Sequence, residues 1–196
     1  MMDAPKLGRR EQILMVLANE LENNLGSPIT TSSLASAIGF SEAALYRHFA
    51  SKSQMFESLI NFAEQSVFSS VNDILKQEND SVIQIQKITY LILTFSERNP
   101  GVTRVLIGDV LLGENKKLHA RTAHFFERIE TQIRQILREA NLSDGPRPIS
   151  NIDAITNQVL SYIEGKLSYF VRSTFIKKPT EHMDIQWEVM KKGFFR

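Results

Sequence analysis

Residues 30–49 read Thr-Thr-Ser-Ser-Leu-Ala-Ser-Ala-Ile-Gly-Phe-Ser-Glu-Ala-Ala-Leu-Tyr-Arg-His-Phe, and this stretch decides the fold. Ala35 lies four residues before Gly39, and Leu45 lies six residues after it. An alanine lets one helix approach another closely, and a glycine tolerates the positive φ that a tight turn between helices needs. Leu45 then anchors the second helix. The spacing predicts a DNA-binding helix-turn-helix, and a helical hairpin inside an unrelated bundle is the alternative.

Hydroxyl side chains stand where the two short helices should begin. Thr30 or Thr31 can accept a hydrogen bond at the start of the first helix, Ser41 can cap the second, and Gly39 supplies the stop between them. If the second helix enters a major groove, its leading residues face base edges and the later ones reach bases or phosphates. The predicted DNA-binding residues are Arg9 and Arg10 on an N-terminal arm, with Thr30, Thr31, Ser41, Glu42, Ala43, Tyr46, Arg47, His48 and Lys52.

Length and composition narrow the class of protein. The 196 residues suffice for one domain with a sizeable core, or for a small head on a larger body. The formal net charge is +1, so the placement of single cations, and not total charge, must create any DNA-binding surface. The absence of cysteine excludes disulfides and thiolate sites. No apolar run has the length of a membrane span or the form of a secretion signal, and we therefore predict a cytosolic protein.

Apolar residues recur at helical spacing over most of the chain, and no segment alternates as a strand would. The sequence predicts an all-α fold of about nine helices. It divides into a three-helix head over residues 1–52 and a dimerisation and partner-binding body over residues 53–196, and residues 1–8 are expected to be disordered. Helices outside the motif are expected over residues 9–25, 53–77, 81–97, 102–108, 114–141, 152–175 and 184–195.

The sequence lacks the patterns that enzymes and metal sites need. His119 and His124 are five residues apart, so on a helix they diverge instead of sharing a face. Paired carboxylates, a phosphate-binding glycine loop and a nucleophile elbow are all missing. We therefore predict no catalytic residue, no metal and no cofactor.

Two sets of residues resemble a known family. Residues 41–49, with Ser51-Lys52 and Phe56 after them, resemble the recognition-helix signature of the TetR family of bacterial transcription factors. The motifs at 97–101 (Glu-Arg-Asn-Pro-Gly), 126–130 (Phe-Glu-Arg-Ile-Glu) and 170–173 (Phe-Val-Arg-Ser) resemble the nucleoid occlusion factors within that family. The resemblance implies a cytoplasmic, nucleoid-associated homodimer that binds palindromic double-stranded DNA, as one or two dimers per site. The helices on either side of Pro179 are expected to form the dimer interface.

The same resemblance implies a protein partner. Nucleoid occlusion factors engage the C-terminal tail of the tubulin-like division protein FtsZ and prevent Z-ring assembly over unsegregated DNA. The residues that match the family's groove for this tail are Phe62, Leu91, Arg98 and Asn99. Ser70 stands where the family has an arginine, and Thr94 where it has a glycine. Each change is expected to cost about 1 to 3 kcal/mol of binding free energy.

The alternative function is a ligand-responsive transcriptional repressor of the same family. In that case an apolar molecule enters the body and moves the helix over residues 53–77, which changes the spacing of the two heads. A closed, well-packed body would count against this alternative. An open apolar cavity with a few polar groups in its lining would support it.

Overall fold

The computed structural model describes residues 8–26, 28–111, 116–142 and 144–196, and within these ranges it contains nine α-helices and no β-strand. Pro148 and Phe195 form a single antiparallel bridge. The predicted all-α architecture is confirmed for these residues. Of residues 1–8, which are expected to be disordered, residues 1–7 lie outside the described ranges, and Gly8 is the residue before the first helical residue, Arg9.

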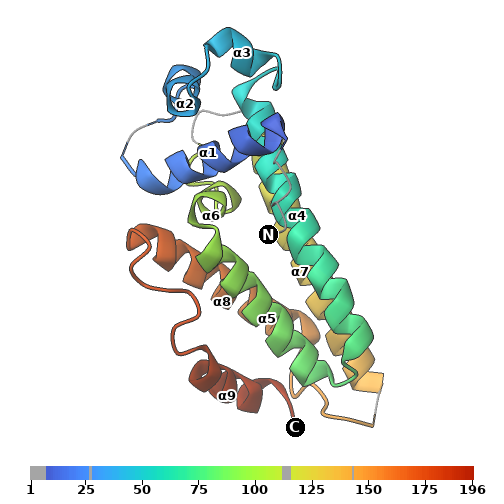
Figure 1. Ribbon diagram of the computed structural model, residues 1–196. Coiled ribbons are helices and arrows are strands. Elements are labelled where there is room, and N and C mark those ends of the chain that lie inside the picture. The colour runs from blue at the N-terminus through green and yellow to red at the C-terminus, as the bar shows by residue number, and fades with distance from the viewer. Residues whose placement is uncertain (1–7, 27, 112–115, 143) are drawn as a thin grey trace, which may run out of the picture.

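The helices form an elongated molecule with the helix-turn-helix at one end (Figure 1). The head contains α1 (Arg9–Asn23), α2 (Thr31–Ile38) and α3 (Glu42–Tyr46). The long helix α4 (Lys52–Gln77) runs from the head along the body, and α5 (Ser81–Arg98) returns towards the head. The short α6 (Pro100–Leu106) lies directly below α1. The body is completed by α7 (Lys116–Leu142), which packs on α4, by α8 (Ile152–Arg172) and by α9 (Met183–Phe194).

Several helices begin or end at residues other than those that the sequence predicts. The chain leaves α8 at Arg172, before the expected Phe175, because Thr174 and Phe175 adopt positive φ angles of 54° and 63°. In α6 the helix begins at Pro100, since a proline suits the first helical position, where its missing N–H is not needed. The expected start of α7 at residue 114 falls outside the described residues.

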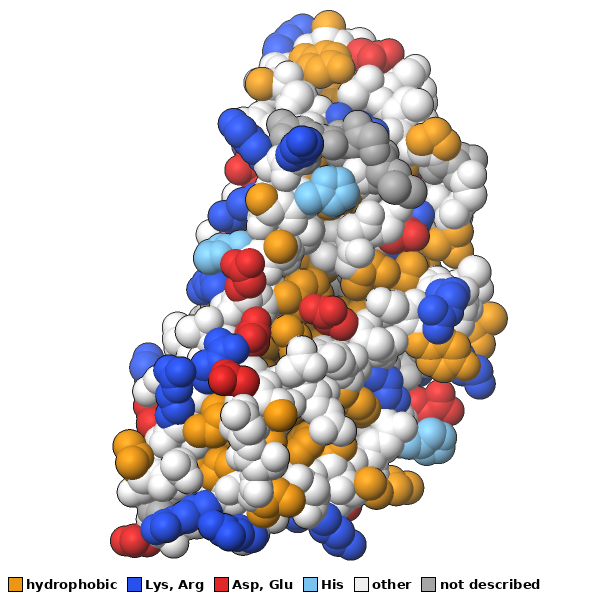
Figure 2. All heavy atoms as spheres, turned by 180° about the vertical axis from the view of Figure 1, so that it is seen from behind, with side chains coloured by type: hydrophobic (Ala, Val, Ile, Leu, Met, Phe, Trp, Pro, Cys, Tyr) orange, Lys and Arg blue, Asp and Glu red, His pale blue; other side chains and the backbone are white. Residues whose placement is uncertain are grey.

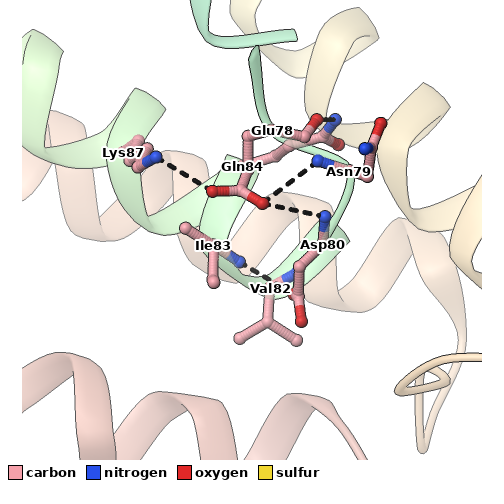
Figure 3. Close-up of polar contacts among 7 residues, drawn as sticks. All are labelled: Glu78, Asn79, Asp80, Val82, Ile83, Gln84 and Lys87. Carbon is pink, nitrogen blue, oxygen red and sulfur yellow. Dashed lines mark hydrogen bonds and ion pairs between the residues drawn. The ribbon is translucent and has the colours of Figure 1, made fainter.

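The turn between α4 and α5 is held by the side chains of Glu78 and Asp80 (Figure 3). Glu78 accepts hydrogen bonds from the N–H groups of Asn79 and Asp80 at 3.0 and 3.2 Å, and from Nζ of Lys87 at 2.9 Å. Asp80 caps α5 by accepting from two N–H groups of its first turn, at 2.8 and 3.1 Å. The hydrogen bond from Lys87 lowers the pKa of Glu78. This corner turns α5 back along α4.

One hydrophobic core runs through the head and the body. Leu17 of α1 and Leu45 of α3 are fully buried and belong to the same contiguous cluster as Phe56 of α4 and Ile133 of α7. The expected division between residues 52 and 53 falls in the first turn of α4, whose first residue is Lys52. Head and body therefore share a core, and the division of the chain into two domains stays a prediction.

The backbones of α1 and α6 touch at Gly101. A Cβ atom placed on Gly101 would lie 2.0 Å from the carbonyl oxygen of Ala18 and 2.8 Å from its carbonyl carbon. No side chain fits at such distances, so only glycine allows this approach. The contact fixes how closely the head packs on the body.

Arg104 of α6 ties the end of α1 to the body. Its side chain is 8% exposed and donates to the carbonyl oxygens of Leu21 and Asn24 at 2.6 and 3.1 Å. Its Nε also pairs with Asp109 at 2.6 Å. The last turn of α1 has no basic residue of its own. Arg104 therefore provides the cation that the free carbonyls and the dipole at the end of a helix favour.

Candidate nucleic-acid interface and partner groove

The turn of the helix-turn-helix has the predicted geometry. Gly39 adopts φ 77° and ψ 30°, and its N–H donates to the carbonyl oxygen of Ser36 at 3.1 Å. The N–H of Phe40 donates to the carbonyl oxygen of Ala35 at 2.8 Å. These hydrogen bonds are those of a helix that ends at a glycine in the left-handed region. The requirement for a positive φ at position 39 is confirmed.

The two short helices are capped by hydroxyl groups. Thr30 is the cap of α2, accepting from the N–H of Ser33 at 3.0 Å, and Thr31 is the first residue of the helix. Ser41 caps α3 by accepting from the N–H of Ala44 at 3.2 Å. Each cap satisfies one N–H group that has no partner within its helix.

The recognition helix is anchored as predicted but is shorter than its motif. Leu45, Ala35 and Phe49 are buried. The motif covers residues 41–49, whereas α3 ends at Tyr46. The N–H groups of His48 and Phe49 both donate to the carbonyl oxygen of Leu45, at 3.0 and 3.1 Å, so the chain tightens into a turn there. His48 and the preceding Arg47 therefore follow the helix instead of continuing it.

The outer surface of α3 is exposed. Glu42, Ala43, Tyr46 and Arg47 all face solvent. Thr31 donates to a carboxylate oxygen of Glu42 at 3.0 Å, which links the starts of α2 and α3. The predicted DNA-binding residues of α3 therefore form one accessible surface at the end of the molecule.

Arg9 and Arg10 lie in the first turn of α1, where the helix expected over residues 9–25 begins, so the N-terminal arm that carries them is helical. The guanidinium group of Arg10 donates to the carbonyl oxygen of His48 at 2.5 Å and lies 4.2 Å from the centre of the Phe49 ring. Arg9 lies 5.6 Å from the centre of the Phe40 ring. These contacts brace the residues around α3 from behind. A DNA contact by either arginine stays a prediction.

Lys52 and His48 are also partly engaged by aromatic rings. The ammonium group of Lys52 lies 5.5 Å from the centre of the Phe56 ring. The rings of His48 and Phe40 stack with centres 6.5 Å apart. Both residues are half-buried at the edge of the head. Their polar ends remain candidates for phosphate contacts.

The predicted partner-binding residues lie around three hollows, two that adjoin each other and one farther along the body. The first, which we call the junction hollow, measures about 370 Å³ and lies between α1, α4 and the α5–α6 corner. Phe62 and Asn99 line it, and Arg98 lines an adjoining hollow of about 360 Å³. Leu91 instead lines the distal hollow, about 580 Å³, between α4, α5 and the start of α9. Three of the four predicted residues therefore lie together, and Leu91 lies farther along α5.

Phe95 of α5 lies between Phe62 of the junction hollow and Leu91 of the distal hollow. Phe62 is 45% exposed, and the centre of its ring lies 6.0 Å from that of the Phe95 ring. Asn99 donates from Nδ2 to the carbonyl oxygen of Phe95 at 2.7 Å. Leu91 lies one turn before Phe95 on α5. An apolar strip therefore leads along α4 and α5 from Phe62 towards Leu91.

Sequence reasoning missed the residues that α1 and α9 contribute. Leu14 and Met15 of α1 line the junction hollow, and Met183 of α9 lines the distal one. One feature of the sequence could have indicated Met15. It is an apolar residue that lies outside the helix face defined by the buried Ile13 and Leu17. Nothing in the sequence indicates that α9 reaches α5.

The two positions that depart from the family pattern, Thr94 and Ser70, lie on α5 and α4. Thr94 lines the distal hollow, and its Oγ1 is buried without a hydrogen-bond partner. The hydroxyl of Ser70 donates to the carbonyl oxygen of Ser66, its own helix, at 3.1 Å.

The described ranges contain neither a metal-ligand cluster nor a membrane-spanning helix. There, no three His, Asp or Glu side chains gather as metal ligands would. Likewise, none of the helices described combines the length and the apolar character that a membrane crossing requires.

Comparisons with known proteins place the chain in a family. Residues 27–59 match the family model described as "Bacterial regulatory proteins, tetR family". Residues 79–194 match the SlmA-like model described as "Tetracyclin repressor-like, C-terminal domain". The nucleoid occlusion factor SlmA of Shewanella frigidimarina is 49% identical over 198 residues, which cover 100% of both chains. This chain belongs to the SlmA family. SlmA of Alteromonas mediterranea is 48% identical over 96% of this chain and 97% of its own.

Membership of the SlmA family confirms the resemblance that the recognition helix and the body motifs indicated. SlmA and the other TetR-family regulators are DNA-binding proteins and not enzymes. Solved structures share the fold. The fatty acid degradation regulator FadR of Bacillus halodurans has a TM-score of 0.79, with 96% of this chain and 97% of that chain covered at 13% identity. KstR2 of Mycobacterium tuberculosis has a TM-score of 0.76, with 96% of both chains covered at 16% identity.

Proposed function

We propose that this protein is a DNA-dependent nucleoid occlusion factor that binds the C-terminal tail of FtsZ and blocks Z-ring assembly over the chromosome. The observation that carries the proposal is the 49% identity, over the whole of both chains, with a protein named nucleoid occlusion factor SlmA. The capped helix-turn-helix and the partly apolar groove along α4 and α5 supply surfaces for the two partners. The protein would act on the nucleoid, in the cytoplasm.

The exposed surface of α3 is the proposed DNA contact. Ser41, Glu42 and Ala43 stand at its leading end, where a recognition helix meets base edges. Arg47 follows on the exposed turn and can donate to a base or a phosphate. Thr30, at the start of α2, is positioned beside this surface through the Thr31–Glu42 hydrogen bond.

Reversing the charge of Arg47 tests the DNA contact. We expect Arg47→Glu to abolish specific DNA binding. The substitution replaces a cation at the DNA surface with a carboxylate, which the DNA phosphates repel. Arg138→Glu is the matched control, since Arg138 is exposed on α7 and the net charge changes equally. Fluorescence anisotropy on a DNA duplex that the protein selects from genomic fragments gives both affinities. Equal affinities for the two variants would refute the assignment of α3.

The dimer is proposed to form through α8 and α9. Ile185 and Val189 of α9 are 69% and 70% exposed and lie one turn apart, on the same face of the helix. Tyr169 of α8 is also exposed. The body shows hydrophobic side chains at its surface on the side opposite to that of Figure 1 (Figure 2). A two-fold arrangement of two helices from each subunit would cover such residues and set the spacing of the heads.

A labelled peptide with the sequence of the FtsZ C-terminal tail tests the partner. We expect it to bind, and to bind more tightly in the presence of the selected DNA duplex. Phe62→Gln should weaken binding about 5-fold or more, because it removes an apolar contact at the centre of the proposed groove. If the wild-type protein binds specific DNA but no peptide, the proposal is wrong, and a ligand-responsive repressor becomes the better explanation.

A further inference from the structure

A polar hollow of about 280 Å³ lies where the body adjoins the DNA-binding head. Ala50 and Ser51 line it, and these two residues join the turn after α3 to the start of α4. The lining also includes Lys117 and Arg121, which come from the start of α7. A distant segment of the chain therefore borders the turn that follows the recognition helix.

The start of α7 is fixed beside α4. Arg121 donates to a carboxylate oxygen of Glu64 at 2.6 Å. Farther along the two helices, the rings of Phe125 and Phe68 are in contact, with centres 5.6 Å apart. Both helices therefore run away from the head in the same direction. Lys117, which precedes Arg121, lies at the end of α7 that is nearest to the head.

Local helix stability does not explain the lysines at this end of the molecule. Lys116 and Lys117 are exposed in the first turn of α7, and this turn has no acidic residue. The positive end of a helix dipole lies there, so a lysine at these positions opposes helix formation. The start of α4 is similar, because Lys52 is its first residue and its first turn also has no acidic residue. Residues that break a local rule are expected where a function requires them.

The charge around the hollow is positive on balance. Residues 50–64 and 116–121 carry four cations, Lys52, Lys116, Lys117 and Arg121, and two carboxylates, Glu57 and Glu64. Glu64 is already paired with Arg121. Glu57 is exposed in the lining and opposes the binding of an anion there. The remaining positive charge lies on lysines, whose long side chains suit phosphate groups.

We infer that the start of α7 is a second contact with the DNA backbone, in which Lys116 and Lys117 bind phosphates outside the base pairs that α3 reads. The inference rests on the proposed function, because it requires DNA on the outer surface of α3. Two observations favour DNA as the partner. The hollow borders the turn after α3, and the lysines continue the positive charge that Lys52 begins at the head.

Contacts with phosphates and contacts with bases have different effects on binding. A lysine that binds a phosphate releases counterions, so it raises the affinity for any sequence and makes that affinity more sensitive to salt. It carries no information about the bases. The start of α7 is therefore expected to determine how tightly the protein holds DNA, whereas α3 determines which DNA it selects.

Replacing both lysines tests the inference. The experiment measures the affinity for the selected duplex, extended by flanking base pairs at both ends, by anisotropy over a series of salt concentrations. We expect the double variant Lys116→Gln, Lys117→Gln to bind more weakly. The slope of log affinity against log salt concentration should decrease in magnitude by about 0.9 for each phosphate contact that is lost. The preference for the selected duplex over a scrambled one should remain.

Three further variants serve as controls. The double variant Lys116→Arg, Lys117→Arg should keep the wild-type slope, because both cations remain. The double variant Lys191→Gln, Lys192→Gln removes the same charge from α9, at the other end of the molecule (Figure 1), and should bind as the wild-type protein does. Glu57→Gln should strengthen binding, because it removes a carboxylate that repels phosphates.

Four results would overturn the inference. If the glutamine variant of α7 keeps the wild-type slope while Arg47→Glu loses specific binding, α7 does not contact DNA and the proposed role of α3 stands. If the α9 variant changes the slope equally, only total charge matters. If the preference for the selected duplex is lost together with the affinity, the lysines support the head and do not bind phosphates. If the wild-type protein binds no duplex, the proposed function and the inference both fail.

Discussion

The DNA-binding surface and the partner groove are built in opposite ways. The helix-turn-helix comes from 20 consecutive residues, and its polar contacts join neighbours such as Thr30 with Ser33 and Ser41 with Ala44. The junction hollow takes its lining from α1, α4 and the α5–α6 corner, between residues 11 and 102 of the chain. A surface of the first kind can be recognised from a short motif. A surface of the second kind exists only where the helices are packed together.

The helix α1 belongs to both regions. Its first turn braces the residues after α3 through Arg10, and its last turn is held by Arg104 of the body. One face of the helix is buried in the shared core, and the exposed Met15 faces the junction hollow. The contrast between the two regions can therefore be tested by substitutions in the full chain, at the junction, within the head and within the body.

The largest effect is expected at the junction. Arg104→Met should lower the free energy of unfolding by about 2 to 4 kcal/mol, because it leaves two carbonyl groups and the carboxylate of Asp109 without their donor. Urea unfolding at a fixed protein concentration measures the loss. Arg138→Met on the exposed surface of α7 controls for the general loss of an arginine. If the two variants unfold at the same urea concentration, Arg104 does not join the head to the body.

A smaller effect is expected for a change within the head. Thr30→Ala removes the acceptor for the N–H of Ser33 and should cost about 1 kcal/mol of stability. Ser32→Ala, at an exposed position of the same helix, is the control and should cost nothing measurable. Thermal unfolding without DNA compares the two variants. A loss as large as that of Arg104→Met would mean that the head depends on its own contacts more than on the body.

The smallest effect is expected in the body, at Glu97 of α5. Partial burial would raise the pKa of its carboxyl group, but hydrogen bonds from Thr180 and Lys178 and the charge of Lys178 together lower it. A lowered pKa in the folded state stabilises the protein above the unfolded value of 4.5, and this stabilisation is lost as the pH falls through the folded value. We expect less than about 1 kcal/mol, because the pair lies near the surface.

Unfolding of Glu97→Gln measured from pH 7 to pH 3 checks this expectation. The wild-type protein should be the more stable at pH 7, and the difference should shrink below pH 4.5. Glu57→Gln, at an exposed position of α4, serves as the control. A difference that grows towards low pH would contradict the direction of the pKa shift.

Where the sequence failed, tertiary contacts had replaced local preference. The expected helix over residues 9–25 does include Arg9 and Arg10, but only the structure shows their contacts with the rings of Phe40 and Phe49. The helix α3 ends at Tyr46, because the turn after it lets Phe49 enter the core. Leu91 lies in the lining of the distal hollow together with Met183 of α9, a neighbour that the sequence did not indicate, and its role in partner binding stays a prediction.

The sequence by itself determined the helical class, the turn at Gly39 and the caps at Thr30 and Ser41, because these depend on φ preferences and hydrogen bonds over a few residues. Its motifs also indicated the family that the comparisons confirm. Only the tertiary structure decided that Gly101 and Arg104 join α1 to α6, and that Met15 faces Phe62 across a hollow. Such contacts link residues that are tens of positions apart. Their partners are set by the packing of whole helices, which no local pattern records.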